Sequence, residues 1–132
     1  MHFKFQDTAP ANTLKAAERV KDLKLTVGII THGSLTFPMG CAGLAYGALF
    51  VGSHQVYPLN PGEYENGNGV TIEWDDYQSV KKGDHWTLRT YNEDIKYEHT
   101  VTLRLDILPE TIAAPWLILK DLASIFKKLL GL

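Results

Sequence analysis

The chain has 132 residues, of which 45% are hydrophobic and 21% charged, and its formal net charge is -2. These values are ordinary for a globular protein and argue against a disordered chain, and the length favours a single domain over residues 1–132. Because the charge is nearly balanced and the basic residues are scattered, we expect no nucleic-acid partner.

Residues 11–23 have the pattern of a helix that follows a short N-terminal strand or arm. Pro10 suits a first helical position, and Thr8 or Asn12 suits the cap. Three apolar residues at helical spacing then form a thin stripe: Leu14, Ala17 and Val20. We therefore predict a helix over about residues 11–23.

A β core is predicted from about residue 24 to residue 108. Apolar and polar residues alternate from Leu23 to Ile29, which predicts a strand, and residues 32–34 look like a turn. Residues 33–53 carry no charge but contain Pro38 and five glycines. We expect short buried strands in this stretch and not a transmembrane helix.

The second half of this core begins with a predicted long loop over residues 55–69, in which Tyr57 and Tyr64 are candidate contact residues. The strand after it alternates from Val70 and is predicted to end at the Asp75–Asp76 pair.

Residues 95–107 alternate apolar and polar side chains without a break, and residues 86–90 form the strand before them. If the two strands form a hairpin with their apolar side chains on one face, Thr90 opposes Ile95. Leu88 then faces Tyr97, and Trp86 faces His99.

The last segment, residues 116–132, has the pattern of an amphipathic helix within a helical region of about residues 110–130. Its polar residues fall within about 120° of arc, so the apolar arc is far wider than the roughly 100° that covers one face of a globule. Residues 116–130 would span about 22 Å, too short for the roughly 30 Å hydrocarbon core of a membrane. The predicted interface consists of the large apolar residues Trp116, Ile118, Leu119, Leu122, Ile125, Phe126, Leu129 and Leu130.

This helix has three possible positions: against its own sheet, shared between its own sheet and another subunit, or on a membrane surface. The overall prediction is an α+β protein, mainly antiparallel β, with an N-terminal helix and a C-terminal amphipathic helix. The β core would be a sandwich or a small barrel.

Several other residues are candidates for chemistry. Asp84, His85 and His99 lie on neighbouring predicted strands and offer imidazole and carboxylate groups for proton transfer or zinc binding. His32 and His54 would meet if the stretch between them were a hairpin.

Cys41 is the only cysteine, which excludes an intramolecular disulfide, and its apolar neighbours favour a buried structural thiol. An acidic set around the long loop could attract calcium: Glu63, Glu65, Glu73, Asp75 and Asp76. These patterns match no established motif, so we predict no catalytic residues, no metal and no cofactor.

The sequence therefore favours a non-enzymatic structural or assembly protein, a small β-rich subunit of a larger homo- or hetero-oligomer. Coat, cement or tail components of virus or phage particles are an architectural analogy. The partners would be further copies of the chain or other protein subunits.

Two alternatives remain: a membrane-surface module that uses the C-terminal helix, and a small enzyme or ligand-binding barrel that uses Asp84, His85 and His99. The first ten residues lack the apolar run of a signal peptide. We expect a cytoplasmic location or a place in an assembled particle.

Overall fold

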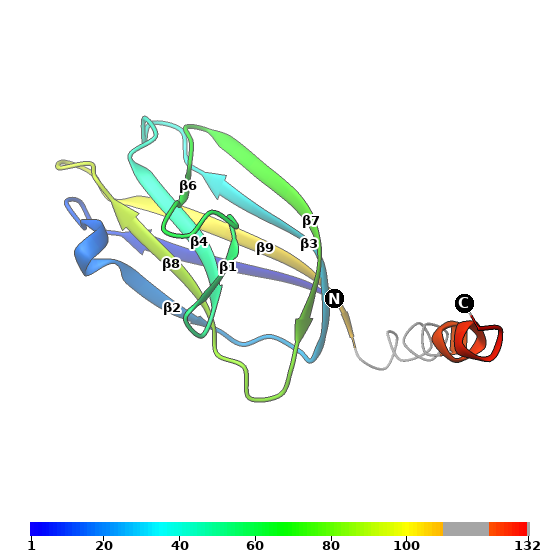
Figure 1. Ribbon diagram of the computed structural model, residues 1–132. Helices are drawn as coiled ribbons and strands as arrows, with labels where there is room; N and C mark the ends of the chain where they lie inside the picture. The colour runs from blue at the N-terminus through cyan, green and yellow to red at the C-terminus, as the bar shows by residue number, and fades with distance from the viewer. Residues whose placement is uncertain (110–121, 132) are drawn as a thin grey trace.

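The computed structural model describes residues 1–109 and 122–131 and shows a β sandwich followed by a separate helix (Figure 1). The helix covers residues 122–129. The other elements are β1 (His2–Ala9), the short 3-10 helix η1 (Lys15–Ala17), β2 (Arg19–Leu23), β3 (Gly28–Phe37), β4 (Ala45–Val51), β5 (His54–Tyr57), β6 (Glu65–Asn66), β7 (Val70–Val80), β8 (Trp86–Asn92) and β9 (His99–Pro109).

The strands form two antiparallel sheets, one with the order β1-β9-β3-β7 and the other with the order β2-β8-β4-β5, where β6 also pairs with β4. The pairing is nested along the chain. β1 pairs with β9, β2 with β8, β3 with β7, and β4 with β5 and β6. Nested pairing divided over two sheets in this way is the jelly-roll arrangement.

The hydrophobic core lies between the two sheets. Leu35 and Leu103 from the first sheet and Leu49, Leu88 and Trp86 from the second are almost fully buried. Each fully buried large apolar side chain contributes about 1.5–3 kcal/mol, so this shared core holds the two sheets together.

An ion pair between a buried carboxylate and an exposed guanidinium also joins the sheets. Asp7 on β1 is 7% exposed, and its carboxylate accepts hydrogen bonds from the Arg19 guanidinium on β2 at 3.0 Å and from the Thr90 hydroxyl on β8 at 2.9 Å. The bond to Asp7 raises the pKa of Arg19.

The prediction of a helix over residues 11–23 is wrong. Asn12 has a positive φ of 58°, Lys15–Ala17 make only one 3-10 turn, and Arg19–Leu23 form the edge strand β2. Leu14 and Val20, predicted to form a core-facing stripe, are both more than half exposed. The ladder with β8 supplies backbone hydrogen bonds that outweigh the weak helical preference of this segment.

The predicted hairpin between residues 86–90 and 95–107 is also wrong. β8 and β9 belong to different sheets, so Thr90 pairs with Arg19 and Gly47, and His99 pairs with Ala9. β9 begins only at His99, and Ile95 and Tyr97 are exposed. β9 is bonded on both sides, by β1 and β3, so it has no free edge for pairing beyond the domain.

Other boundaries differ in detail. Residues 32–34 lie inside β3 and are not a turn, and β7 runs on past Asp76 to Val80. The loop predicted over residues 55–69 contains part of β5 and all of β6. The uncharged stretch 33–53 forms the end of β3 and β4, as predicted, and no helix within the described part of the chain is long and apolar enough to cross a membrane.

Candidate functional site

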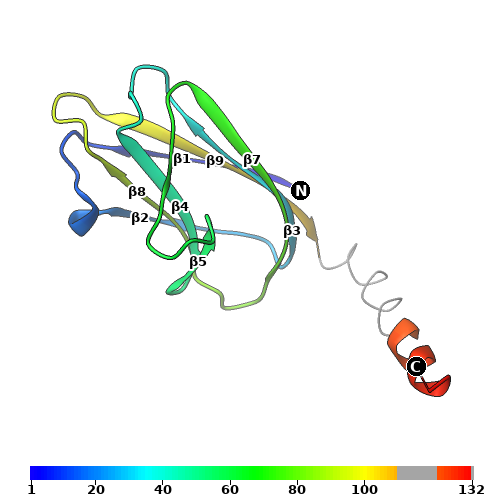
Figure 2. The same cartoon turned by 45° about the horizontal axis from the view of Figure 1, so that its top comes forward.

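The first candidate site is the apolar face of the helix over residues 122–129. Figures 1 and 2 both place this helix beyond the end of the sandwich and against neither sheet. Of the predicted interface residues, Trp116, Ile118 and Leu119 lie outside the described residues. The other five are between 54% and 79% exposed: Leu122, Ile125, Phe126, Leu129 and Leu130. The structure thus leaves the described apolar face uncovered.

A second apolar surface lies on the outer face of the sheet β1-β9-β3-β7. A shallow depression of about 200 Å³ is lined by Ile29 and Thr31 of β3, Tyr77 of β7 and Leu108 of β9. Tyr77 is 84% exposed, which is unusual for a side chain of this size. We call these four residues the outer patch. It lies beside Pro109, where the last strand ends.

Asp84, His85 and His99 do not come together. The Asp84 carboxylate accepts a hydrogen bond from the Lys81 backbone N–H, and His85 pairs with Asp22 at 2.7 Å. His85 lies directly before the start of β8. His99 bonds Asp94 at 2.7 Å, and Asp94 lies just after the end of β8, so the two histidines are at opposite ends of this strand. Seven strand residues span roughly 20 Å, so the two histidines cannot act on one substrate atom.

His32 and His54 are not neighbours either, because they belong to β3 and β5 in different sheets. His32 instead bonds the Asp75 carboxylate at 2.9 Å and Glu73 at 3.4 Å on the outer face of β7. These bonds, the one to Asp75 foremost, raise the pKa of His32. The acidic set is therefore divided between two faces, and the described residues contain no group of three metal-ligating side chains.

Cys41 is fully buried, as predicted, and its thiol donates a hydrogen bond to the Gly67 carbonyl. Cys41 lies in the connection between β3 and β4, and its hydrogen bond links this connection to the segment after β6.

The two loop tyrosines pack within their own domain. Tyr64 packs against Phe50 and Tyr91, and its hydroxyl donates a hydrogen bond to Glu18. Burial and this bond raise the pKa of Tyr64. Tyr57 stacks on Trp74, with 3.8 Å between ring centroids and 4° between ring planes. Both tyrosines thus fasten the loop to the sandwich.

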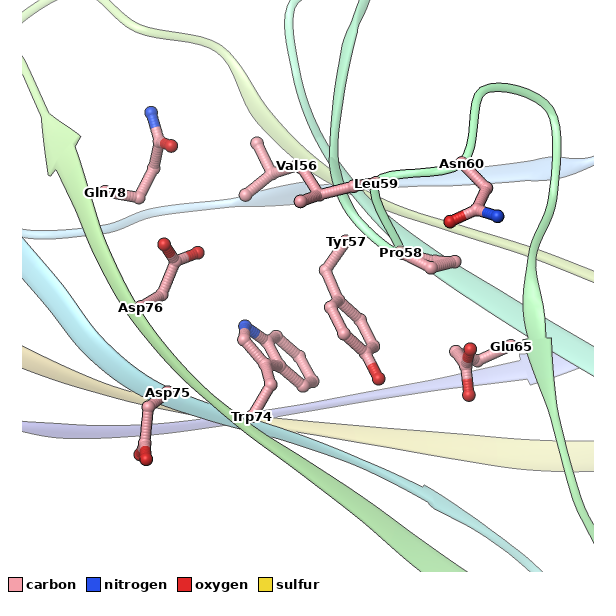
Figure 3. Close-up of a pocket in the computed structure, with 10 residues that line it drawn as sticks. All are labelled: Val56, Tyr57, Pro58, Leu59, Asn60, Glu65, Trp74, Asp75, Asp76 and Gln78. Carbon is pink, nitrogen blue, oxygen red and sulfur yellow. The ribbon is translucent and has the colours of Figure 1, made fainter.

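The second candidate site is a cleft at the edge of the sandwich where β5 and β7 face each other (Figure 3). We call it the β5–β7 cleft. Its volume is about 390 Å³, and it is lined by Val56, Tyr57, Pro58, Leu59, Asn60, Glu65, Trp74, Asp75, Asp76 and Gln78. The stacked Tyr57–Trp74 pair lies at its centre, and burial and the Glu65 charge raise the pKa of Tyr57.

The sequence interpretation missed this cleft because it ended the strand at Asp75 and Asp76. The alternation breaks after Asp75, because Asp76 and Gln78 are polar at inward positions and Tyr77 is apolar at an outward one. No local pattern therefore indicated that the strand continues to Val80.

Comparisons with protein-family models, with curated proteins and with solved structures each give no match to this chain.

Proposed function

We propose that this chain is a structural subunit of a larger assembly and that its C-terminal helix docks onto another copy of the chain. The observation that carries the proposal is the uncovered apolar face of residues 122–130, in which each of five large side chains is more than half exposed. Burial of each such side chain would contribute about 1.5–3 kcal/mol, and soluble proteins rarely expose apolar patches of this kind without a partner.

The outer patch supports this choice of partner. It is mainly apolar, it includes the exposed ring of Tyr77, and two aspartates lie near it on the same face of the sheet. Asp75 lies two residues before Tyr77 on β7, and Asp106 two residues before Leu108 on β9, so each shares the outer face of the sheet. Each also bonds a histidine, Asp75 to His32 at 2.9 Å and Asp106 to His2 at 2.6 Å.

The helix carries the matching charge. Lys127 and Lys128 are exposed on its polar side. An apolar row next to two lysines therefore complements an apolar patch next to two aspartates.

The fold is compatible with this role without deciding it. Jelly rolls occur in viral capsid proteins, in lectins and in cupins, so the arrangement alone does not select a function. A coat, cement or tail component of a virus or phage particle is one form that the proposed subunit would take.

The test is the mass of the full chain in solution, measured by size-exclusion chromatography with light scattering over a range of concentrations. We expect a multiple of 14.8 kDa for the wild type. Phe126→Glu, which places a charge on the apolar face, should give the monomer. The control Ser124→Glu adds the same charge on the polar face of the same helix and should keep the oligomer.

A wild-type mass of 14.8 kDa at every concentration contradicts the proposal. If such a monomer also binds phosphatidylserine vesicles, and Phe126→Glu abolishes that binding, the helix serves a membrane-surface module instead.

A further inference from the structure

The inner face of β7 carries both apolar and polar side chains. Every second residue of this strand faces the opposite sheet, and the row begins with Val70, Ile72 and Trp74 and ends with the buried Val80. Asp76 and Gln78 occupy the two inward positions between them. Two polar side chains thus interrupt an apolar row where the β5–β7 cleft opens.

An inward charge on an edge strand also discourages pairing with other molecules. That role explains Asp76 but not Glu65, which lies on β6 in the other sheet and lines the same cleft. The cleft is acidic from both sides.

Neither of these two carboxylates is neutralised within the described residues. Both side chains are half-buried, and neither forms an ion pair with any residue in 1–109 or 122–131. The one hydrogen bond that the Asp76 carboxylate accepts from the described part of the chain comes from the backbone N–H of Tyr77, at 2.8 Å. The lining contains no Lys, Arg or His, and the third acid, Asp75, is already bonded to His32. A partly desolvated negative charge without a countercharge favours a cationic ligand.

The middle of the cleft is aromatic and rigid. Tyr57 stacks on one face of Trp74, and the other face lies against Gly33, where a Cβ atom would come within 2.3 Å of the indole. Figure 3 shows Asp76 and Glu65 on opposite sides of this ring pair.

The remaining wall is apolar. Val56 and Leu59 line it, and Leu59 is 74% exposed. An alkyl stem would fit against this wall while a charged head reaches a carboxylate.

We propose that the β5–β7 cleft binds an organic cation, an ammonium or guanidinium group carried on an apolar stem. Its volume of about 390 Å³ suits a small ligand or one long side chain. Because Tyr57 and Gly33 cover the two faces of Trp74, the aromatic group that can add to the attraction of the carboxylates is the ring of Tyr57. This site is separate from the outer patch and from the C-terminal helix. Cation binding can therefore be present or absent whether or not the proposed assembly forms.

The experiment titrates the isotope-labelled full chain with 1,5-diaminopentane and follows the indole N–H of Trp74 by NMR, assigned with Trp74→Phe. 1,5-Pentanediol is the neutral probe of the same shape. We expect saturable binding of the diamine with a Kd of about 1 mM or tighter, weakened by added salt, and no saturable binding of the diol.

Matched variants localise the site. Asp76→Asn should weaken diamine binding by about tenfold, since it removes one charge-assisted hydrogen bond, and Glu65→Gln should weaken it in the same direction. Glu73→Gln removes the same charge from the outer face of the same strand and should leave the Kd unchanged.

A second arm identifies the source of the cation. A capped lysine amide that binds as well as the diamine, while a capped norleucine amide does not, assigns the site to a side chain of a polypeptide. Binding of the diamine alone assigns it to a free amine.

The proposal is overturned if the diol binds as well as the diamine, if no probe saturates, or if Asp76→Asn and Glu73→Gln have equal effects.

Discussion

Gly33→Ala tests how the indole of Trp74 is held between the two sheets. The two residues are cross-strand partners, Gly33 on β3 and Trp74 on β7. An added Cβ would lie 2.3, 2.6 and 2.8 Å from three indole atoms, all closer than side chains tolerate. The ring has little room to retreat, because Tyr57 stacks on its far side at 3.8 Å.

The expected change in the free energy of unfolding is the difference between two opposing effects. Overpacking of this kind costs about 1–3 kcal/mol. Gly33 does not have a positive φ, so alanine is compatible with its backbone, and the loss of unfolded-state entropy returns about 0.4–1 kcal/mol. We predict a net destabilisation of about 1–2 kcal/mol, or roughly 4–7 °C in Tm for a chain of this size.

The assay is urea unfolding of four proteins: the wild type, Gly33→Ala, Trp74→Ala and the double variant. Without the indole, the Gly33→Ala substitution should cost nothing or stabilise slightly, which gives a coupling energy of about 1–2 kcal/mol. The reasoning is refuted if Gly33→Ala is as stable as the wild type, or if it costs the same with and without Trp74.

Three further predictions concern groups away from the cleft. Arg19→Ala leaves the buried Asp7 carboxylate without its countercharge and should lower the free energy of unfolding, measured with urea at pH 7, by about 2–3 kcal/mol. This loss should be larger than the loss caused by Asp7→Asn, and a larger loss for Asp7→Asn would contradict the prediction. The raised pKa of His32 means that its protonated form stabilises the fold below about pH 6.5 and that this contribution disappears as the pH rises through the folded pKa. An NMR titration should find that pKa above its usual range, and Asp75→Asn should lower it; an unchanged value would show that Asp75 is not the cause. Cys41, fully buried, should react with a thiol reagent only at the rate of unfolding, and immediate labelling of the native protein would show that the thiol is accessible.

The sequence predicts most strands of this fold but not their partners. Period-two alternation predicted a strand over residues 95–107, and β9 covers His99–Pro109, where the apolar side chains face a core on one side only. The prediction then paired this strand with its neighbour in sequence, which is the commoner arrangement in antiparallel sheets. In a nested jelly roll the partner of His99 is Ala9, 90 positions earlier, and no local pattern records that pairing.

In the N-terminal segment the local pattern did not even determine the type of secondary structure. Pro10 and Asn12 are equally good at helix starts and in turns, so the cap pattern was ambiguous. A strand at the edge of a sheet needs few buried side chains, and β2 buries only Leu23. Its identity as a strand depends on the β8 ladder, which is a tertiary interaction.

Of the two candidate sites, one could be predicted from the local sequence pattern and the other could not. The apolar arc of the C-terminal helix is a property of local periodicity, so the order of the residues is enough to reveal it. The β5–β7 cleft depends on Tyr57 meeting Trp74 across the edge of the sandwich, and on Glu65 and Asp76 lining it from different sheets. Such a site becomes visible only when the strand order is known.

The most direct test of the proposed docking is an isotope-filtered NMR experiment on a one-to-one mixture of labelled and unlabelled full-length chains. We predict cross-peaks between the methyl groups of Ile125 and Leu129 in one copy and the ring of Tyr77 in another copy. If instead those methyl groups show no contact with a second copy at a concentration where the protein is fully folded, the proposed docking of the C-terminal helix is wrong.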